Sequence, residues 1–280
     1  MKIAYCGFDF FHTCLRYLLQ AGHEVHRVYS FPCDGHFNFN TYVKEMARNR
    51  RIPFSVKPVC AADIQALEQQ GVELLISAGY QYKIPDLSAS SIKGINIHPT
   101  LLPTGRGVWP LPWIILKQLP TSGVTLHKLS NEMDGGDIVL QRSFSVDANE
   151  NLETLSCKVQ LLAVEMLNQV MEDVGTYWQQ ATAQQGEVSV WPMPAMQDRY
   201  LDWQQSITDI DRIARAFSKF GSCCHFDNKM WWVYDLRTWS TLHDYEPGSV
   251  VHRTNTETVI AASDGLVCLR YFQQGESQSV

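Results

Sequence analysis

Two patterns that identify common cofactor sites are missing from this chain of 280 residues. Its eight cysteines are scattered and form no Cys-x-x-Cys pair, which argues against a zinc site and predicts reduced thiols. The first strand-like run ends in a single glycine, Gly7, and no Gly-x-Gly-x-x-Gly motif follows it. We therefore expect neither a metal nor a dinucleotide cofactor.

Long apolar runs and excess positive charge are also lacking. No apolar run reaches the length that crosses a membrane, and the strand-like run from Lys2 to Gly7 leaves no room for a signal peptide. The 23 Lys and Arg residues against 29 Asp and Glu residues give a formal net charge of −6. This balance argues against a protein that binds polyanions without regard to sequence. We expect a soluble, cytoplasmic protein with no membrane partner.

What the chain does contain is an alternation of strand-like and helix-like segments. Residues 2–7, 11–21 and 24–29 read as strand, helix and strand with short joins, which predicts a right-handed parallel unit. The same patterns predict strands at 52–56, 74–78, 94–97, 123–129 and 138–144, and helices at 41–50, 61–70, 110–117 and 151–174. The fold class expected is α/β, a Rossmann-like, mainly parallel sheet with helices on both faces.

The character of the chain changes near residue 181. Residues 184–187 are polar, and 191–194 read as an extended, proline-broken segment. A helical stretch at 201–217 and short strands at 229–234, 249–251, 259–262 and 267–271 are expected beyond it, with fraying at 272–280. We therefore predict a larger domain at 1–185, a linker at 186–199 and a small, mainly β C-terminal domain at 200–280. Whether Trp231 and Trp232 lie in its core or stack a nucleobase stays open.

The most informative stretch is the short strand that ends at His98. Asn96 and His98 are two residues apart, so on a strand both side chains lie on the same face. Pro99 cannot continue a central ladder, which predicts that the strand ends there. A polar pair at the carboxyl end of a strand in an α/β protein marks a candidate active site. From these two residues alone, a turn-capping role is the simpler interpretation.

Four blocks in sequence order change that balance. They are Asn96-Ile97-His98-Pro99-Thr100-Leu101-Leu102-Pro103, Arg106-Gly107, Gly123-Val124-Thr125 and Asp134-Gly135-Gly136-Asp137-Ile138. Together they resemble the signature of the 10-formyltetrahydrofolate-dependent formyltransferases, the group that contains glycinamide ribonucleotide, methionyl-tRNA and amino-sugar formyltransferases. Thr100 stands where Ser is usual and keeps the hydroxyl. The resemblance covers about residues 1–180 well and the C-terminal part more loosely.

The resemblance implies formyl transfer from 10-formyltetrahydrofolate to an amine, without a metal, and three catalytic residues. Asn96 offers an amide donor suited to holding the oxyanion of a tetrahedral intermediate. His98 can accept and return a proton near neutral pH. Asp134, 36 residues later, is a carboxylate that would favour the charged imidazole and raise its pKa. Asp137 and His127 read as structural residues.

Binding residues are implied by the same resemblance. The loop after residues 74–78 resembles the family loop that cradles the folate pterin, and the glycines after Asp134 would let their loop approach the folate closely. The implied folate contacts are Ala78, Gly79, Tyr80, Tyr82, Ile84, Gly135 and Gly136. Some relatives carry Arg where Tyr82 stands, which leaves open whether Tyr82 or Lys83 contacts the folate tail. Thr100 would orient the strand end or the substrate, and Arg106 suits an anionic group on the acceptor; the alternative for Arg106 is a surface arginine.

The acceptor amine is less clear from the sequence. The stretch Phe31–Asn40 has no Lys or Arg, whereas tRNA formyltransferases carry a basic loop there, so tRNA is not favoured. We expect a small acceptor, a nucleotide-linked amino deoxysugar, and keep N5-hydroxyornithine and methionyl-tRNA as alternatives. A folate-binding protein with an inactive site is the non-enzymatic alternative. The resemblance also implies a homodimer formed through the β domain.

Overall fold

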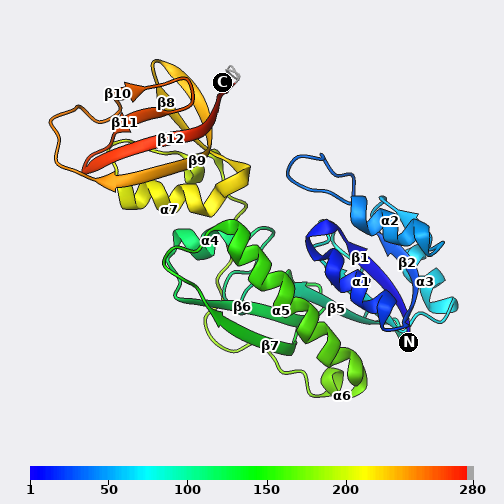
Figure 1. Cartoon of the computed structure of the whole chain (residues 1–280). Helices are drawn as coiled ribbons and strands as arrows, with labels where there is room; N and C mark the ends of the chain where they lie inside the picture. The colour runs from blue at the N-terminus through cyan, green and yellow to red at the C-terminus, as the bar shows by residue number, and fades with distance from the viewer. Residues whose placement is uncertain (276–280) are drawn as a thin grey trace. The chain divides into compact units, whose positions relative to one another are not determined.

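The computed structural model describes residues 1–275 (Figure 1). Contacts divide the chain into two units. The first comprises Met1–Pro110, Thr121–Ser145 and Cys157–Pro192, and the second comprises Leu111–Pro120, Val146–Ser156 and the chain from Met193. The expected linker at 186–199 is thus shared between the units, and two short segments from earlier in the chain join the second unit. The domain boundaries at 185 and 200 stay a prediction.

The first unit is built on a sheet of seven strands among the described residues. They are β1 (Lys2–Gly7), β2 (Glu24–Tyr29), β3 (Phe54–Ser55), β4 (Leu74–Ala78), β5 (Lys93–His98), β6 (Thr121–Lys128) and β7 (Ile138–Ser145). Their order is β3-β2-β1-β4-β5-β6-β7. The first five in this order pair in parallel, and β6 and β7 add antiparallel pairs at one side. This arrangement confirms the expected mainly parallel sheet.

Helices of the first unit connect and flank these strands (Figure 1). They are η1 (Asp9–Phe11), α1 (His12–Gln20), α2 (Thr41–Asn49), α3 (Ala61–Gln69), α5 (Leu152–Glu172), whose first turn lies in the second unit, and α6 (Val174–Gln179). α1 buries Cys14, Leu15 and Leu18 on one stripe, as its helical spacing predicts. α6 was not predicted from the sequence; it begins where the Asp173 side chain accepts a hydrogen bond from the Thr176 amide.

The middle of the sheet is buried on both faces. All five residues of β4 are buried, and β1 is buried from Ile3 to Cys6. Strands covered on both faces read as continuous apolar runs rather than as an alternation, which is the pattern of both segments. This rigid centre holds the neighbouring β5, from which the candidate catalytic residues come.

The second unit is an antiparallel sheet with one packed helix. Within residues 1–275 its elements are α4 (Leu111–Leu116), η2 (Met196–Arg199), α7 (Ile207–Phe217), η3 (Ser218–Phe220), β8 (Ser222–Phe226), β9 (Lys229–Ser240), β10 (Val250–Arg253), β11 (Thr258–Ala261) and β12 (Gly265–Gln274). The strand order is β10-β11-β12-β9-β8, which confirms a smaller, mainly β C-terminal domain. α7 begins at Ile207 and not near 201, because Ser206 caps it by accepting the Asp209 amide.

The core of the second unit settles part of the tryptophan question. Trp231 stacks on Phe226 with ring centroids 4.8 Å apart and also contacts Phe272. Trp232 instead stacks with Arg199, whose guanidinium carbon lies 5.2 Å from the centroid of the Trp232 ring. The fraying expected from residue 272 is wrong for 272–274, which belong to β12, and residues 276–280 lie outside the described part of the chain.

Candidate active site

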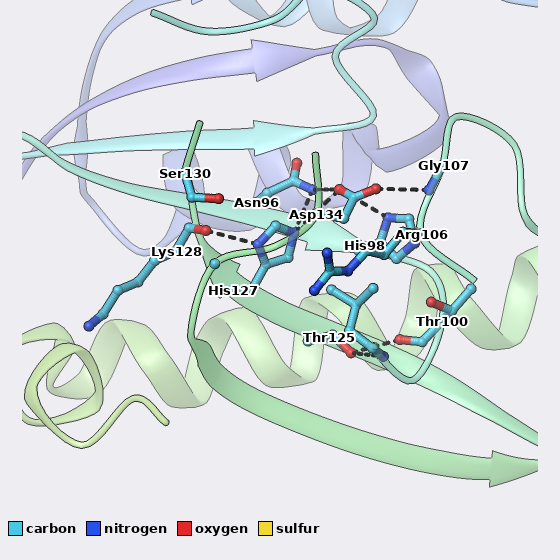
Figure 2. Close-up of polar contacts among 12 residues, drawn as sticks. Asn96, His98, Thr100, Arg106, Gly107, Thr125, His127, Lys128, Ser130 and Asp134 are labelled. Carbon is cyan, nitrogen blue, oxygen red and sulfur yellow. Dashed lines mark hydrogen bonds and ion pairs between the residues drawn. The ribbon is translucent and has the colours of Figure 1, made fainter. Parts of the chain in front are cut away.

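Four polar side chains lie together at the carboxyl end of β5 (Figure 2). Asn96 and His98 come from β5, and the antiparallel register places Asn96 opposite His127 on β6. Asp134 comes from the loop between β6 and β7. Because β1, β4 and β5 run in parallel, the ends of all three strands meet at this edge of the sheet, where α/β proteins bind their ligands.

The Asn96 amide is held by two of these neighbours. Its Nδ2 lies 3.0 Å from His127 Nε2 and donates a longer hydrogen bond, 3.4 Å, to Asp134 Oδ1. The first contact fixes the direction of the amide. The second hydrogen bond is long and therefore weak, so its hydrogen can turn towards another acceptor, such as a carbonyl oxygen that gains negative charge.

His98 has one nitrogen engaged with the backbone and one facing a carboxylate. Its Nε2 lies 2.8 Å from the carbonyl oxygen of Gly105, which can only accept, so this nitrogen carries the proton in the neutral ring. Its Nδ1 lies 3.6 Å from Asp134 Oδ1. Nδ1 is therefore the basic atom of neutral His98, and a proton taken up there would face Asp134.

Burial decides the charge of His98. Burial of the ring lowers the pKa of His98, and this effect outweighs the Asp134 carboxylate and the Gly105 hydrogen bond, which raise it. His127 and Arg106 act in the same direction as burial. The sequence had predicted only the carboxylate effect. The result is a neutral imidazole at neutral pH, which is the form that accepts a proton.

Asp134 is the ionised partner in this cluster. Burial raises the pKa of its carboxyl, but the adjacent His127 and His98 rings and the Gly107 amide outweigh it and bring the pKa to about 2. The Gly107 N–H donates to Oδ2 at 3.0 Å. Asp134 itself has a φ of 50°, a left-handed conformation that Asp and Asn tolerate better than most residues. The loop thus turns sharply to aim this carboxylate at His98.

His127 belongs to the cluster, although the sequence indicated only a structural residue. Its side chain is buried, and its Nδ1 lies 2.9 Å from the Lys128 carbonyl oxygen. A carbonyl can only accept, so Nδ1 carries the proton and Nε2 is left to accept from Asn96. The signal that would have identified His127 is the β5–β6 register, which sequence patterns do not provide.

The two residues expected to bind the acceptor lie in the same region but are engaged by the protein. Thr100 donates its hydroxyl to the Thr104 carbonyl at 2.7 Å, inside the loop after β5. Arg106 is only 5% exposed, and its guanidinium donates to Glu132 and to Gln184. Binding of an acceptor anion by Arg106 stays a prediction.

The residues expected to contact folate occupy two segments. Ala78 ends β4, Gly79 has a φ of 71°, and Ile84 is buried in the core. The Tyr80 hydroxyl accepts from the Val59 amide at 3.2 Å. Tyr82 lies edge-on to the Tyr80 ring, with centroids 5.6 Å apart.

The glycines after Asp134 are required by the protein itself. A Cβ added to Gly136 would lie 1.9 Å from the Lys128 carbonyl oxygen, and one on Gly135 would lie 2.5 Å from the Glu132 carboxylate. Contact of these glycines with a folate, for which they were singled out, stays a prediction.

A pocket of about 580 Å³ lies at the amino end of β5, at the opposite end of the strand from His98, and none of the residues expected to contact folate lines it. It is lined by the chain that follows Ile84, from Asp86 to Gly94, and by Leu129, Ser130 and Asn131 of the loop that leads to Asp134, with Trp178 on α6. Its Gly94 is two residues before Asn96 on β5.

Among residues 1–275, no three His, Cys, Asp or Glu side chains are grouped to hold a metal ion. Over the same residues, no helix combines the length and the apolar character needed to span a membrane.

At the carboxyl edge of the mainly parallel sheet lie an amide donor, a neutral imidazole and a carboxylate, groups that could hold an oxyanion and accept a proton. Two family descriptions match the chain: "Formyl transferase" over residues 44–171 and "Formyl transferase, C-terminal domain" over residues 195–280. The chain therefore belongs to the formyl transferase family and is an N-formyltransferase. This confirms the family and the enzyme class expected from the sequence motifs.

Curated relatives match over nearly the whole chain. A methionyl-tRNA formyltransferase of Caldanaerobacter subterraneus subsp. tengcongensis is 25% identical and covers 98% of this chain and 93% of its own length. The methionyl-tRNA formyltransferase of Thermotoga maritima is 27% identical, over 98% and 90%.

Solved structures share the fold at lower identity. HypX from Aquifex aeolicus in complex with tetrahydrofolic acid has a TM-score of 0.72 at 22% identity, over 100% of this chain but 45% of its own. The chain thus spans less than half of HypX. An N-formyltransferase from Helicobacter canadensis, in complex with folinic acid and dTDP-3-aminofucose, has a TM-score of 0.70 at 17% identity, over 98% and 100%.

Proposed function

We propose that this enzyme transfers the formyl group of 10-formyltetrahydrofolate to the amine of a nucleotide-linked amino deoxysugar, with Asn96, His98 and Asp134 as catalytic residues. The observation that carries the proposal is the partly buried cluster these side chains form at the end of β5. Asn96 lies 3.4 Å and His98 lies 3.6 Å from the same carboxylate oxygen, Asp134 Oδ1. An amide donor and a base–carboxylate pair converge there on one point.

The transfer forms one bond and breaks one. The acceptor nitrogen bonds to the formyl carbon, the bond from that carbon to N10 breaks, and one proton leaves the acceptor nitrogen while N10 gains one. In this proposal His98 takes the proton at Nδ1, Asp134 stabilises the imidazolium so formed, and Asn96 donates a hydrogen bond to the formyl oxygen. The low pKa of Asp134, about 2, keeps it ionised throughout.

The folate donor is supported by the relatives. HypX is described with tetrahydrofolic acid, and a sugar 3N-formyltransferase, WlaRD, with 5-N-formyltetrahydrofolate. In this chain the loop at 78–84 follows β4 and the Asp134 loop follows β6, and the polar cluster at the end of β5 includes Asp134. We propose that these two segments hold the folate, with Tyr82 or Lys83 towards its tail.

The loop at the end of β2 supports the proposed acceptor. Asp34 accepts hydrogen bonds from the amides of His36, Phe37 and Asn38, which closes Phe31–Asn40 on itself. The closed loop carries Phe37 and Phe39, both about half exposed, and no cation. A site that grips tRNA phosphates needs several cations, so this loop favours a small acceptor over tRNA. The curated methionyl-tRNA formyltransferases keep tRNA as the second candidate.

Turnover with a panel of amines tests the proposal. Purified enzyme, 10-formyltetrahydrofolate and one acceptor at a time are mixed, and free tetrahydrofolate is followed by absorbance. Turnover with a nucleotide-linked amino sugar supports the acceptor, whereas turnover with N5-hydroxyornithine or methionyl-tRNA alone reassigns it. Absence of turnover with all three contradicts the proposed acceptor class.

Variants test the residues. Asn96→Ala and His98→Ala are expected to lose about 10²–10³ in kcat or more, while His252→Ala, an exposed histidine on β10, keeps wild-type turnover. Full turnover in both site variants would rule out the catalytic roles. A homodimer and a cytoplasmic location stay predictions.

A further inference from the structure

The segment from Gln184 to Trp191 contributes contacts that a linker would not make. We propose that Gln184 is a positioning residue that holds the Asp134 loop in its catalytic conformation, an inference that rests on the proposed role of Asp134. Gln184 lies outside the stretch matched by the formyl transferase description, residues 44–171. It also lies 50 residues after Asp134, so no local motif links the two.

The side-chain amide of Gln184 both donates and accepts hydrogen bonds. Its Nε2 donates to the carbonyl oxygens of Asp134, at 2.6 Å, and of Gly136, at 2.9 Å. Its Oε1 accepts two hydrogen bonds from Arg106, one from Nη2 at 2.8 Å and one from Nε at 3.2 Å. One side chain therefore ties the backbone on either side of Gly135 to the buried guanidinium of Arg106.

The backbone of Arg106 is itself held in place by hydrogen bonds. Its backbone N–H donates to the Ser189 carbonyl at 3.0 Å, and its carbonyl accepts from the Trp191 amide at 2.8 Å. Arg106 Nη1 donates a hydrogen bond to the carboxylate of Glu132, the residue at which the turn into Asp134 begins. The Asp134 loop is thus held at Glu132, at Asp134 and at Gly136, in each case through Arg106 or Gln184.

The neighbouring loop that supports His98 is held by the same segment. The Gly105 amide donates to Ser189 Oγ at 2.9 Å, and the Gly105 carbonyl lies against His98 Nε2. Gly107, whose amide binds Asp134, has a φ of 132° and packs directly on the Trp191 carbonyl. Both catalytic side chains therefore depend on chain beyond residue 183 for their position.

The Asp134 loop needs such support because its own backbone does not favour one conformation. Asp134 has a positive φ, and two glycines follow it, which leaves the loop wide conformational freedom. Without Gln184 the two carbonyl oxygens could turn to water. A displacement of about 1 Å at a catalytic group can cost about 10²-fold in rate.

Three variants separate positioning from folding. Gln184→Ala removes every contact, Gln184→Glu keeps an acceptor for Arg106 but cannot donate to the carbonyls, and Gln185→Ala changes the exposed neighbour. For both Gln184 variants we expect kcat to fall by about tenfold to a hundredfold with KM for the donor within about twofold of wild type. Gln185→Ala is expected to match wild type in both constants.

Hydrogen exchange provides a readout that does not depend on the substrate. Amide exchange of the peptide spanning residues 129–137 is expected to rise in both Gln184 variants and to stay at the wild-type level in Gln185→Ala. Unchanged exchange overturns the proposal even if no acceptor turns over. Raised exchange with unchanged kcat, or wild-type kcat in Gln184→Glu, overturns the positioning role. Absence of turnover by wild-type enzyme counts against the proposed function alone, since the exchange measurement still decides whether Gln184 holds the loop.

Discussion

Replacing Asp134 with asparagine removes the negative charge 3.6 Å from His98 Nδ1. The substitution keeps the shape of the side chain, and its amide oxygen can still accept from the Gly107 N–H. Asparagine also tolerates the left-handed φ of 50° at this position. The loop should therefore stay closed while the charge is lost. Because the carboxylate raises the pKa of His98 against the effect of burial, its loss is expected to lower that pKa further.

The size of the effect follows from the distance. Two unit charges 3.6 Å apart interact by about 4 to 5 kcal/mol at an effective dielectric constant of about 20, which is an upper limit for this pair. About 1.4 kcal/mol changes a proton-binding constant tenfold. If a quarter to a half of the charge–charge energy is effective, the midpoint of the His98 titration moves by about one pH unit or more. The direction is towards acid. At neutral pH the imidazole stays neutral in both proteins.

Titration by NMR of protein labelled with ¹⁵N in histidine measures this midpoint directly. The chain has nine histidines, and a His98→Asn variant identifies the His98 signals by their loss. Asp137→Asn is the matched control. It removes a carboxylate from the same loop, and that carboxylate pairs with Lys128 at 3.0 Å. We expect an acid displacement for His98 in Asp134→Asn and none in Asp137→Asn. An unchanged midpoint, or one displaced to higher pH, would refute the ion-pair reasoning.

Two further variants test neighbouring parts of the site. His127→Ala removes the acceptor that orients the Asn96 amide, and we expect kcat to fall by about tenfold to a hundredfold; a wild-type kcat would show that Asn96 needs no such support. Gly107→Ala places a Cβ 2.3 Å from the Trp191 carbonyl oxygen, and we expect it to lower the free energy of unfolding by about 3 kcal/mol in urea titrations. Its control is Gly186→Ala, which has a positive φ but open space around it, so equal losses in both variants would exclude the clash as the cause.

The strands and helices that position the site could be predicted because their signals are local. The apolar run 74–78 coincides with β4, and the Asn96–His98 spacing does place both side chains in one cluster. The strand Ser222–Phe226 was missed, because Ser-Cys-Cys-His-Phe contains no β-branched residue and no regular alternation. Its burial in the second unit comes from pairing with β9, which is a tertiary effect.

The partners of the catalytic residues could not be predicted for a related reason. His127 faces Asn96 across an antiparallel pair joined by a connection of more than twenty residues, and such a register depends on packing and not on local pattern. Gln184 contacts Arg106 from 78 residues away. Its polar neighbourhood in the sequence reads as a loop or linker, since nothing local distinguishes an amide that binds backbone from one that faces water.

The sequence and the structure give opposite directions for the pKa of His98, and the difference matters for catalysis. A carboxylate partner alone would favour an imidazolium, which cannot accept a proton from an attacking amine. Burial reverses that preference and leaves a neutral base. In the proposed mechanism the same carboxylate acts one step later, because it stabilises the imidazolium only after the proton has arrived, inside a region of low dielectric where the attraction is strong. Burial and the Asp134 charge thus oppose each other in the resting enzyme. In the proposed mechanism this opposition makes the pair stabilise the transition state more than the ground state.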